Sequence, residues 1–414
     1  VRVTTRVLLP FSIVGGLLLV WQGVPQNLTG NLVVDTIEGT KQAIAMGPVA
    51  ALEIIKHLGT NGGGFIGANS TTPIENPTII SDLIELYSMM LLPGACVITF
   101  GKMVRDRKKA MAESSEVKVD LRKSLTARIY GREGRSIFLA MGIIFLIGLS
   151  LCFWSESQGN PALADAGLSQ SMGSMEGKEV RFGIAQSAMF TTTTTSFTTG
   201  TVNNMHDTLT PLGGMVPLLH MMLNVVFGGK GVGLMNMIMY AILAVFICGL
   251  MIGRTPEYLG KKIEGREMKL TALCIIIHPF LILAFSALAV GTAAGQEGIT
   301  NPGFHGLSQV LYEYASSAAN NGSGFEGLAD NTYFWNITAG LAMFFGRYLS
   351  IVIQLAIAGS LMKKRFVNES AGTLHTDTFS FAVILVFVVY IFAALTFFPA
   401  LALGPIAEHL TLWA

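Results

Sequence analysis

Charge is scarce in this sequence. Of its 414 residues only 13% are Asp, Glu, Lys or Arg, whereas 51% are hydrophobic and the mean hydropathy is +0.56. A water-soluble chain needs about 25% charged residues to keep its surface hydrated. The composition therefore argues against a soluble domain and indicates a protein surrounded by lipid. The net charge of +1 and the lack of a large basic patch argue against a nucleic-acid partner.

Paired cysteines and catalytic motifs are missing as well. The four cysteines lie in apolar stretches without C-x-x-C spacing, so we expect buried free thiols at Cys96, Cys152, Cys248 and Cys274. The sequence has no H-x-x-x-H pair, no G-x-x-x-x-G-K-[ST] phosphate loop, no D-K-T-G motif, and neither H-E-x-x-H nor G-x-S-x-G. We therefore expect no ATP hydrolysis by this chain, no intramembrane enzyme activity and no cofactor.

Long apolar runs are abundant, and a helical span needs about 20 such residues. Six runs are candidate spans: Val7–Gln22, Ile79–Phe100, Ser136–Phe153, Leu270–Gly295, Trp335–Met362 and Phe379–Pro405. A seventh crossing lies within Pro211–Gly253. The sequence thus predicts an all-α polytopic membrane protein.

Basic residues set the expected orientation, because loops rich in Lys and Arg stay in the cytoplasm. Residues 102–135 hold 11 of the 27 Lys and Arg residues, and residues 254–269 and 363–378 are also basic. We therefore expect a cytoplasmic N-terminus and an extracytoplasmic C-terminus. The four tryptophans would then all lie at outer span ends, where indole rings anchor well: Trp21, Trp154, Trp335 and Trp413.

The 43 residues of Pro211–Gly253 carry one charge, Lys230, inside the stretch F-G-G-K-G-V-G. Two full spans here would reverse the orientation of the basic loop that follows. We therefore interpret the segment as one crossing broken by a Gly-rich intramembrane loop, which is tolerated where the backbone faces protein or water. The alternative is an ordinary hairpin turn at the membrane surface.

The three outer segments share one plan, a short apolar run followed by a loop rich in Gly, Thr and Asn. The runs are too short to cross a bilayer and suit re-entrant half-helices: Met46–Leu58, Ile184–Phe190 and Leu307–Ala319. The loops are Thr60–Phe65, Thr191–Val202 and Asn320–Phe325. The first and third match at a constant offset, since Asn61, Gly62 and Gly64 meet Asn321, Gly322 and Gly324. Such similarity predicts repeated units around an axis.

These loops have the chemistry of a filter for a dehydrated alkali cation. Backbone carbonyls can replace the hydration shell of K⁺ if they turn inward, which requires backbone angles that glycine adopts readily. Neutral Thr and Asn oxygens add ligands. We predict a filter formed by Thr60, Asn61, Gly62, Gly63, Thr198, Thr199, Gly200, Asn320, Asn321, Gly322 and Ser323, centred on the glycines at 62, 200 and 322, with K⁺ as the only metal. The alternative is that the glycines serve only close packing or flexible turns.

The predicted organisation follows from these features. It comprises a pore repeat at 1–102 (loop 60–65), a cytoplasmic basic loop at 103–135, a pore repeat at 136–253 (loop 191–202), a cytoplasmic loop at 254–269, a pore repeat at 270–362 (loop 320–325), a cytoplasmic loop at 363–378 and a final span at 379–414.

Several motifs carry a family resemblance over essentially the whole chain. The loops T-N-G-G-G-F and N-N-G-S-G-F, with the stretches Met205–Pro217 and Met251–Lys262, closely resemble the potassium-binding A subunits of the bacterial high-affinity potassium-transporting P-type ATPase, the Kdp complex. One departure is Asn224, which stands near a position that is usually acidic in this family.

The resemblance implies span–pore loop–span units of the potassium-transporter superfamily in the bacterial inner membrane. It implies a subunit that binds external K⁺ and passes it sideways through a tunnel. The implied partners are an ATP-hydrolysing P-type subunit, a small periplasm-facing subunit and a tiny single-span subunit. Because the family has four pore loops and ten spans against three and seven here, we expect an N-terminally incomplete chain. The alternative function is a stand-alone potassium channel or ion-coupled symporter of the same superfamily.

Two basic residues lie at expected membrane depth, where a charge costs about 3 kcal/mol or more. Lys230, with Gly228, Gly229 and Gly231, is a candidate gate that blocks direct flow to the cytoplasm; alternatively it snorkels to a surface. Arg347 is a coupling candidate that repels K⁺ or pairs with an acid of a partner; alternatively it is structural. Interfacial hydration or capping is the expected role of four residues near outer span ends, with attraction of cations as the alternative: Asp82, Glu85, His206 and Asp207.

Overall fold

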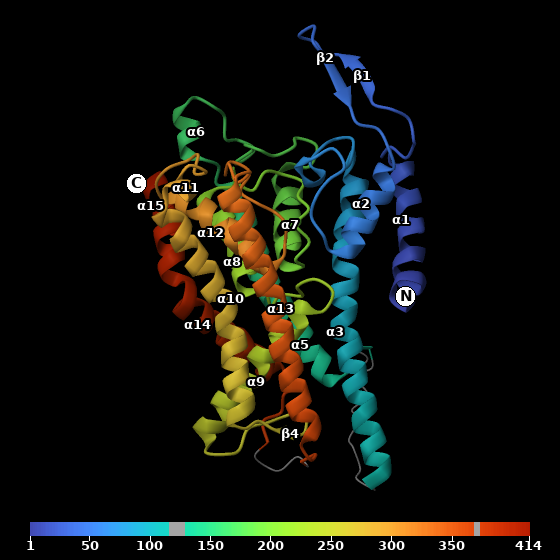
Figure 1. The fold of residues 1–414 in the computed structure, drawn as a ribbon, viewed down its shortest axis with the longest axis vertical. Helices are drawn as coiled ribbons and strands as arrows, with labels where there is room; N and C mark the ends of the chain where they lie inside the picture. The colour runs from blue at the N-terminus through green and yellow to red at the C-terminus, as the bar shows by residue number, and fades with distance from the viewer. Residues whose placement is uncertain (116–128, 368–372) are drawn as a thin grey trace.

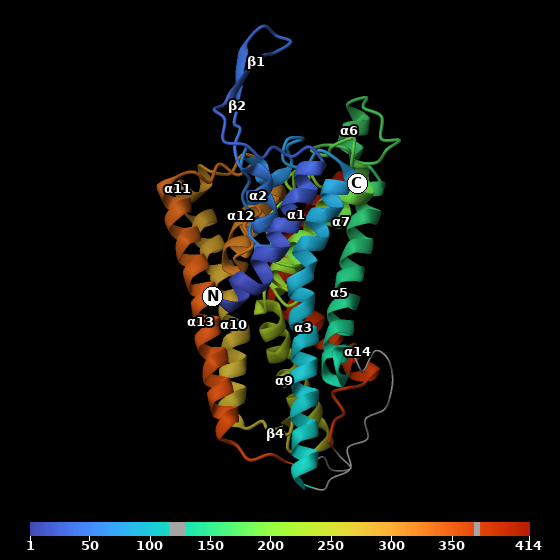
Figure 2. The ribbon, with the colours of Figure 1, turned by 90° about the vertical axis from the view of Figure 1, so that its right-hand side faces the viewer.

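The computed structural model describes residues 1–115, 129–367 and 373–414. Within these residues, seven helices are long and apolar enough to cross a membrane, as the sequence predicts. They are α1 (Leu9–Trp21, with the preceding π-helical turn Thr4–Leu8), α3 (Ile79–Ser115), α5 (Arg132–Ser157), α9 (Val232–Ile252), α10 (Gly265–Gly291), α13 (Tyr333–Lys363) and α14 (Phe379–Leu401). Figures 1 and 2 show them roughly parallel to the long axis of the molecule.

Four shorter helices lie in one half of this bundle, the upper half of Figure 1. They are α2 (Val49–Gly59), α7 (Gly183–Ser196), α8 (Pro211–Leu223) and α12 (Phe304–Ala319). With 11 to 16 residues each, they are too short to cross a bilayer. The remaining helical turns are η2 (Ala68–Ser70), α6 (Pro161–Asp165), α11 (Ala293–Gln296), η3 (Ala402–Ile406) and α15 (Ala407–Leu412).

Two small antiparallel hairpins add to the helices and were not predicted. Strand β1 (Leu32–Asp35) pairs with β2 (Lys41–Ile44), with Leu32 opposite Ile44, and this hairpin projects beyond the helices in Figure 1. Strand β3 (Glu257–Tyr258) pairs with β4 (Lys261–Lys262) at the opposite end. Both residues of its turn, Leu259 and Gly260, have positive φ, as a tight type I′ hairpin requires.

Both predicted boundaries of the basic loop at 103–135 are wrong. Helix α3 continues to Ser115, and α5 already begins at Arg132. Residues 103–115 consist mainly of Lys, Arg, Ala, Met and Glu, which favour helix, so the helix continues after the apolar run ends. The rest of that loop, residues 116–128, lies outside the described residues, as do residues 368–372 of the predicted 363–378 loop.

The predicted loop at 191–202 also begins too early. Residues 191–196 form the last turns of α7, and all of them are buried. Threonine has a modest helix propensity in water, but its hydroxyl can bond a carbonyl of the preceding turn. Thr195 Oγ1 donates in this way to the Thr191 carbonyl at 2.9 Å. Propensity alone therefore misplaced the end of this half-helix.

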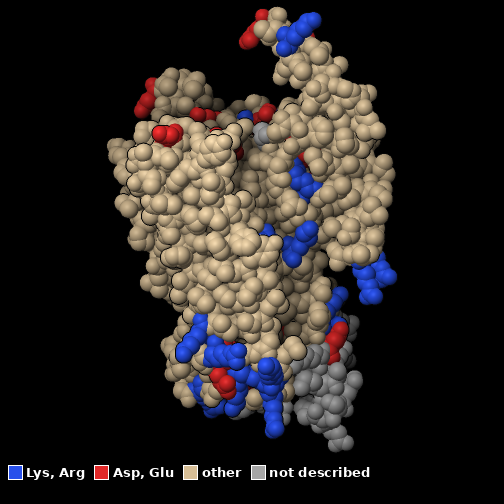
Figure 3. Space-filling model, in the orientation of Figure 1, with Lys and Arg blue, Asp and Glu red and all other residues tan. Residues whose placement is uncertain are grey.

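The largest apolar core joins α5, α9 and α14 around the segment between α8 and α9. Fully buried members include Met141, Val225, Val226 and Leu385. All four cysteines are described and free, as predicted, but only Cys152 and Cys274 are buried; Cys96 and Cys248 are half-buried, because they lie at the edge of the packed helices. In Figure 3 the left part of the middle of the molecule is almost free of charge, a few Lys and Arg side chains show on the right, and most gather at the lower end, which holds the β3–β4 hairpin.

Candidate functional site

The three glycines predicted to be central lie against one another. A Cβ atom placed on Gly62 would lie 3.3 Å from the Gly200 backbone, and one on Gly322 would lie 3.5 Å from the Gly62 Cα. A Cβ on Gly200 would overlap the Asn321 carbonyl. The loops after α2, α7 and α12 therefore meet as bare backbone, so closely at Gly200 that no Cβ atom fits there.

The same turn ends each of the three half-helices and begins the loop that follows. In each, a backbone N–H just after the half-helix donates to the carbonyl five residues earlier: Asn61 to Lys56 at 3.1 Å, Thr199 to Thr194 at 2.8 Å and Asn321 to Ser316 at 2.9 Å. In each, the residue before that donor has a positive φ: 49° at Thr60, 52° at Thr198 and 56° at Asn320. The second loop, which matches the others in sequence only by composition, thus shares their geometry.

Hydroxyl groups of the half-helices hold two of the glycines. The N–H of Gly200 donates to Thr194 Oγ1 at 3.0 Å, and the N–H of Gly322 donates to Ser316 Oγ at 3.1 Å. In the first loop the equivalent position is Lys56, which has no hydroxyl. There the N–H of Gly63 donates to the side chain of Asn69 at 2.5 Å.

Further hydrogen bonds join neighbouring loops. The Asn69 carbonyl accepts from the N–H of Val202 at 2.9 Å and from Thr201 Oγ1 at 2.7 Å. The Asn321 side chain donates to the Thr194 carbonyl at 3.0 Å. Sequence reasoning missed Asn69, whose only signal is an amide in a loop that follows a glycine run.

A chain of buried polar groups supports the third loop. Ser323 Oγ donates to Asn321 Oδ1 at 2.6 Å and contacts the Tyr312 hydroxyl at 2.9 Å. Tyr312 in turn lies 2.6 Å from Nδ1 of His206. Because His206 is fully buried, its predicted interfacial role is wrong. Asp82 and Glu85 are also fully buried, so interfacial hydration is wrong for them too, although Asp82 lies in the first turn of α3, where a carboxylate favours the helix dipole as a capping role requires.

The Gly-rich stretch between α8 and α9 packs beneath the second loop. The N–H groups of Gly228 and Gly229 donate to the carbonyls of Ser196 and Phe197 at 2.9 and 2.7 Å. A Cβ on Gly229 would lie 3.6 Å from Thr60 Oγ1. With Gly231, these glycines have positive φ, so the chain turns here instead of continuing as one helix.

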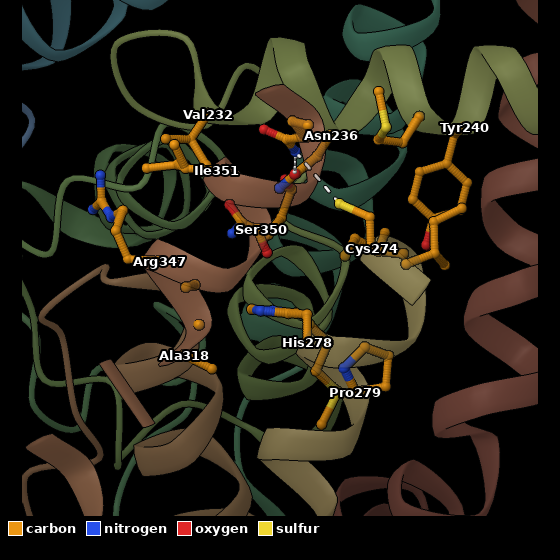
Figure 4. A pocket seen from close by; sticks show the side chains of 18 residues that line it. Val232, Asn236, Tyr240, Cys274, His278, Pro279, Ala318, Arg347, Ser350 and Ile351 are labelled. Carbon is orange, nitrogen blue, oxygen red and sulfur yellow. Dashed lines mark hydrogen bonds between the residues drawn. The ribbon is translucent and has the colours of Figure 1, made fainter. Parts of the chain in front are cut away.

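The two gating candidates occupy different surroundings. Lys230 is exposed, and its Nζ lies 3.9 Å from where a Cβ on Gly59 would be, at the end of α2. Arg347 is half-buried on α13 and lines a cavity that Lys230 does not line. Figure 4 shows Arg347 on the side of this cavity opposite Tyr240.

This cavity lies below the third loop and has a mixed lining, in which several polar side chains stand among apolar ones. Its wall includes Ala318 and Ala319 at the end of α12, Leu223 and Asn224 at the end of α8, and the polar residues Asn236, His278, Ser350 and Gln354. Gln354 donates to Asn236 at 2.8 Å, and Asn236 donates to the Asn224 carbonyl at 2.9 Å. Two helix C-termini thus border the cavity, and their partial negative charge favours a cation.

His305, at the first turn of α12 and outside the spans, is held by two carboxylates. Its Nε2–H donates to Asp207 at 3.0 Å and its Nδ1–H to Glu408 at 2.8 Å. Burial opposes the imidazolium charge, but these hydrogen bonds outweigh it and raise the pKa of His305 to about 9.

This pKa predicts a pH-dependent stability. A raised pKa stabilises the fold fully below the unfolded value of 6.5, and the gain is lost as pH rises through about 9. At about 1.4 kcal/mol per pKa unit the contribution is about 3 kcal/mol. We expect the melting temperature in detergent to fall between pH 7 and pH 10, and to fall less in His305→Gln. An equal fall in both proteins would contradict this assignment.

Comparisons with known proteins agree over nearly the whole length. A family model described as "Potassium-transporting ATPase A subunit" matches residues 1–410. The chain is 57% identical over 412 residues to a protein of Clostridium acetobutylicum named "Potassium-transporting ATPase potassium-binding subunit", covering 100% of this chain and 70% of that protein. It is 53% identical over 412 residues to a protein of the same name from Geobacillus kaustophilus, covering 100% of this chain and 69% of that protein.

Proposed function

The chain belongs to the family of potassium-transporting ATPase A subunits, and on this basis we propose that its three glycine-centred loops take up external K⁺. It is a multi-pass membrane protein and the potassium-binding part of an ATP-driven uptake complex, distinct from the catalytic chain. We propose that the ion then passes to the ATP-hydrolysing subunit of the complex.

One observation carries the proposal, the meeting of Gly62, Gly200 and Gly322 at the ends of three half-helices. A dehydrated K⁺ needs several oxygen dipoles at once, and bare backbone from several directions supplies them. The predicted filter residues include no Asp or Glu, which suits an ion that must leave again. The C-terminal ends of α2, α7 and α12 add partial negative charge close to the loops.

Uptake of ⁸⁶Rb⁺ tests this function in a bacterium that lacks its own potassium uptake. The chain expressed together with the other subunits of its ATPase should restore uptake, and the chain alone should not. A catalytically inactive ATPase subunit serves as the control. Uptake by the chain alone would favour the alternative of a stand-alone channel or symporter.

We propose Lys230 as a gate below the first loop. Its ammonium lies beside Gly59 at the end of α2, and the backbone just before it is fixed by the hydrogen bonds of Gly228 and Gly229 to the end of α7. A unit charge about 6 Å from a potassium ion contributes about 3 kcal/mol of repulsion at an effective dielectric of about 20. Arg347, on the cavity wall, is proposed to repel K⁺ in the same way or to pair with an acid of the ATPase subunit.

Lys230→Ala in the intact complex should therefore raise ATP-independent K⁺ flux. Proteoliposomes loaded with K⁺ and a non-hydrolysable nucleotide measure that flux. Lys262→Ala, which removes an exposed lysine of the β3–β4 hairpin, is the matched control. Equal passive flux in both variants and wild type, with ATP-driven transport intact, would make Lys230 a structural residue.

We further propose a bacterial inner membrane location, with the basic end of Figure 3 in the cytoplasm. The proposed partners beyond the ATPase subunit are a small periplasm-facing subunit and a tiny single-span subunit. In a background without the four native cysteines, a cysteine at Lys262 should react only with reagents applied from the cytoplasm. One at Asp165, the exposed last residue of α6, should react only from outside. The reverse pattern would refute the orientation.

A further inference from the structure

A buried cluster beside the first loop has too many hydrogen-bond acceptors. Glu53 and His57 lie one turn apart on α2, and Glu85 faces them from α3; all three side chains are fully buried. Figures 1 and 2 both show these helices side by side. The sequence shows the i, i+4 spacing of Glu53 and His57, but nothing in it places Glu85 opposite them.

The protonation of His57 follows from its partners. Its Nδ1 lies 2.6 Å from the Glu53 backbone carbonyl, which can only accept, so Nδ1 carries a proton. In the neutral ring Nε2 is then an acceptor. Among the described residues, Nε2 has no hydrogen-bond donor, yet it lies 3.3 Å from Glu85 Oε2. Two acceptors thus face each other in a buried place, and either a shared proton or a metal ion must lie between them.

The carboxylates are equally unsatisfied. Both oxygens of Glu85 and Oε1 of Glu53 are buried without a hydrogen-bond partner. Glu53 uses Oε2 for Lys56 at 2.6 Å and for Ser70 at 2.5 Å. Lys56 therefore compensates one carboxylate charge and leaves the other without a counter-charge in this cluster.

We propose that Glu53, His57 and Glu85 bind a divalent transition-metal ion such as Zn²⁺. One ligand atom from each of the three lies within 4.8 Å of the other two. Zn²⁺ binds His nitrogen and carboxylate oxygen at about 2.0–2.2 Å, so neighbouring ligands in a tetrahedral site lie about 3.3–3.5 Å apart. The 3.3 Å between His57 and Glu85 fits this edge.

The ligand types favour a transition metal over K⁺, Mg²⁺ or Ca²⁺. Hard cations such as Mg²⁺ and Ca²⁺ prefer sites made of oxygen ligands alone. Imidazole nitrogen instead suits zinc and other first-row transition metals such as copper, iron and nickel. The bond from Nδ1 to a backbone carbonyl is the usual support of a metal-binding histidine, because it fixes the tautomer and the ring. Such an ion would tie α2 to α3 three residues before Thr60, and so would fix the first loop from behind.

Metal content of the purified full chain tests the proposal. After exposure to Zn²⁺ and dialysis against metal-free buffer, wild type should retain about one zinc per chain. Glu85→Gln and His57→Gln should lose it. The matched control is Asp82→Asn, one turn from Glu85 on α3, because both Asp82 oxygens already accept hydrogen bonds from Asn76, Asn203 and Gln186.

Zinc X-ray absorption of the wild type adds a test that needs no variant. The expected spectrum shows nitrogen and oxygen ligands at about 2.0–2.2 Å and no sulfur. Wild type that retains no zinc, or Glu85→Gln that retains as much as wild type, would overturn the proposal, and Glu85 and His57 would then share a proton. Equal loss of zinc in Asp82→Asn would also overturn it, because the effect would then come from disturbed packing.

Discussion

Gly200→Ala should reduce ⁸⁶Rb⁺ uptake by the intact complex at least about tenfold, because forcing a side-chain atom into occupied space costs about 1–3 kcal/mol and 1.4 kcal/mol is tenfold. The φ of Gly200 is 86°, and its new Cβ would overlap the Asn321 carbonyl of the third loop. Since two loops lie against this residue, neither can move away without displacing the other.

Gly253→Ala provides the matched control for this effect. Gly253 follows α9 with a φ of 74°, close to that of Gly200, but a Cβ there meets nothing within 4 Å. The Gly253→Ala variant should have the same backbone strain from its positive φ, but its uptake per folded complex should stay within about twofold of the wild-type value. If Gly200→Ala takes up Rb⁺ as wild type does and still rejects Na⁺, the meeting point of the loops is not the ion path.

Glu156→Ala should destabilise the fold by about 3–5 kcal/mol, because it leaves a buried charge without its partner. Glu156 on α5 lies 2.6 Å from Lys178, and both side chains are completely shielded from solvent. Its other oxygen accepts from the N–H and the hydroxyl of Thr210 at 2.9 and 2.6 Å, immediately before α8. One residue thus neutralises a lysine and supports the start of a short helix.

Thermal unfolding in detergent measures this loss. Glu179→Ala is the matched control, because its ion pair with Arg181 is 40% and 24% exposed and such pairs contribute about 0–1 kcal/mol. The double variant Glu156→Ala, Lys178→Ala should be less destabilised than the sum of the two single variants. Additive losses would show that the two charges do not interact.

The sequence predicted the spans and the three loops for a clear physical reason. Lipid exposure requires about 20 apolar residues, and a backbone that meets other backbone requires glycine, so both leave strong local signals. The ends of elements were predicted less well. Five threonines and a serine at 191–196 were predicted as loop because they are polar, although they form the buried end of a helix. The segment 103–115 was predicted as loop because it is basic, although its residues favour helix.

Contacts between distant segments had no such signal. Glu85 stands near the outer end of a span, where water would normally hydrate it, and only the packing of α3 on α2 makes it a buried partner of His57. In the same way, nothing in the sequence joins Asn69 to Val202, which are 133 positions apart. Hydropathy reports how buried a segment is, but not which polar groups meet inside the protein. The roles of Lys230 and Arg347 stay predictions.

The hydroxyls behind the loops also fix the direction of specific oxygen atoms. A peptide unit is planar and trans, so its N–H and its C=O point in opposite directions. When Thr194 and Ser316 bind the amides of Gly200 and Gly322, they turn the carbonyls of Thr199 and Asn321 away from the half-helices. Asn69 does the same for the Gly62 carbonyl through the amide of Gly63. Each hydrogen bond thus opposes a peptide flip, and the direction of these loop oxygens is set by side chains that lie behind them.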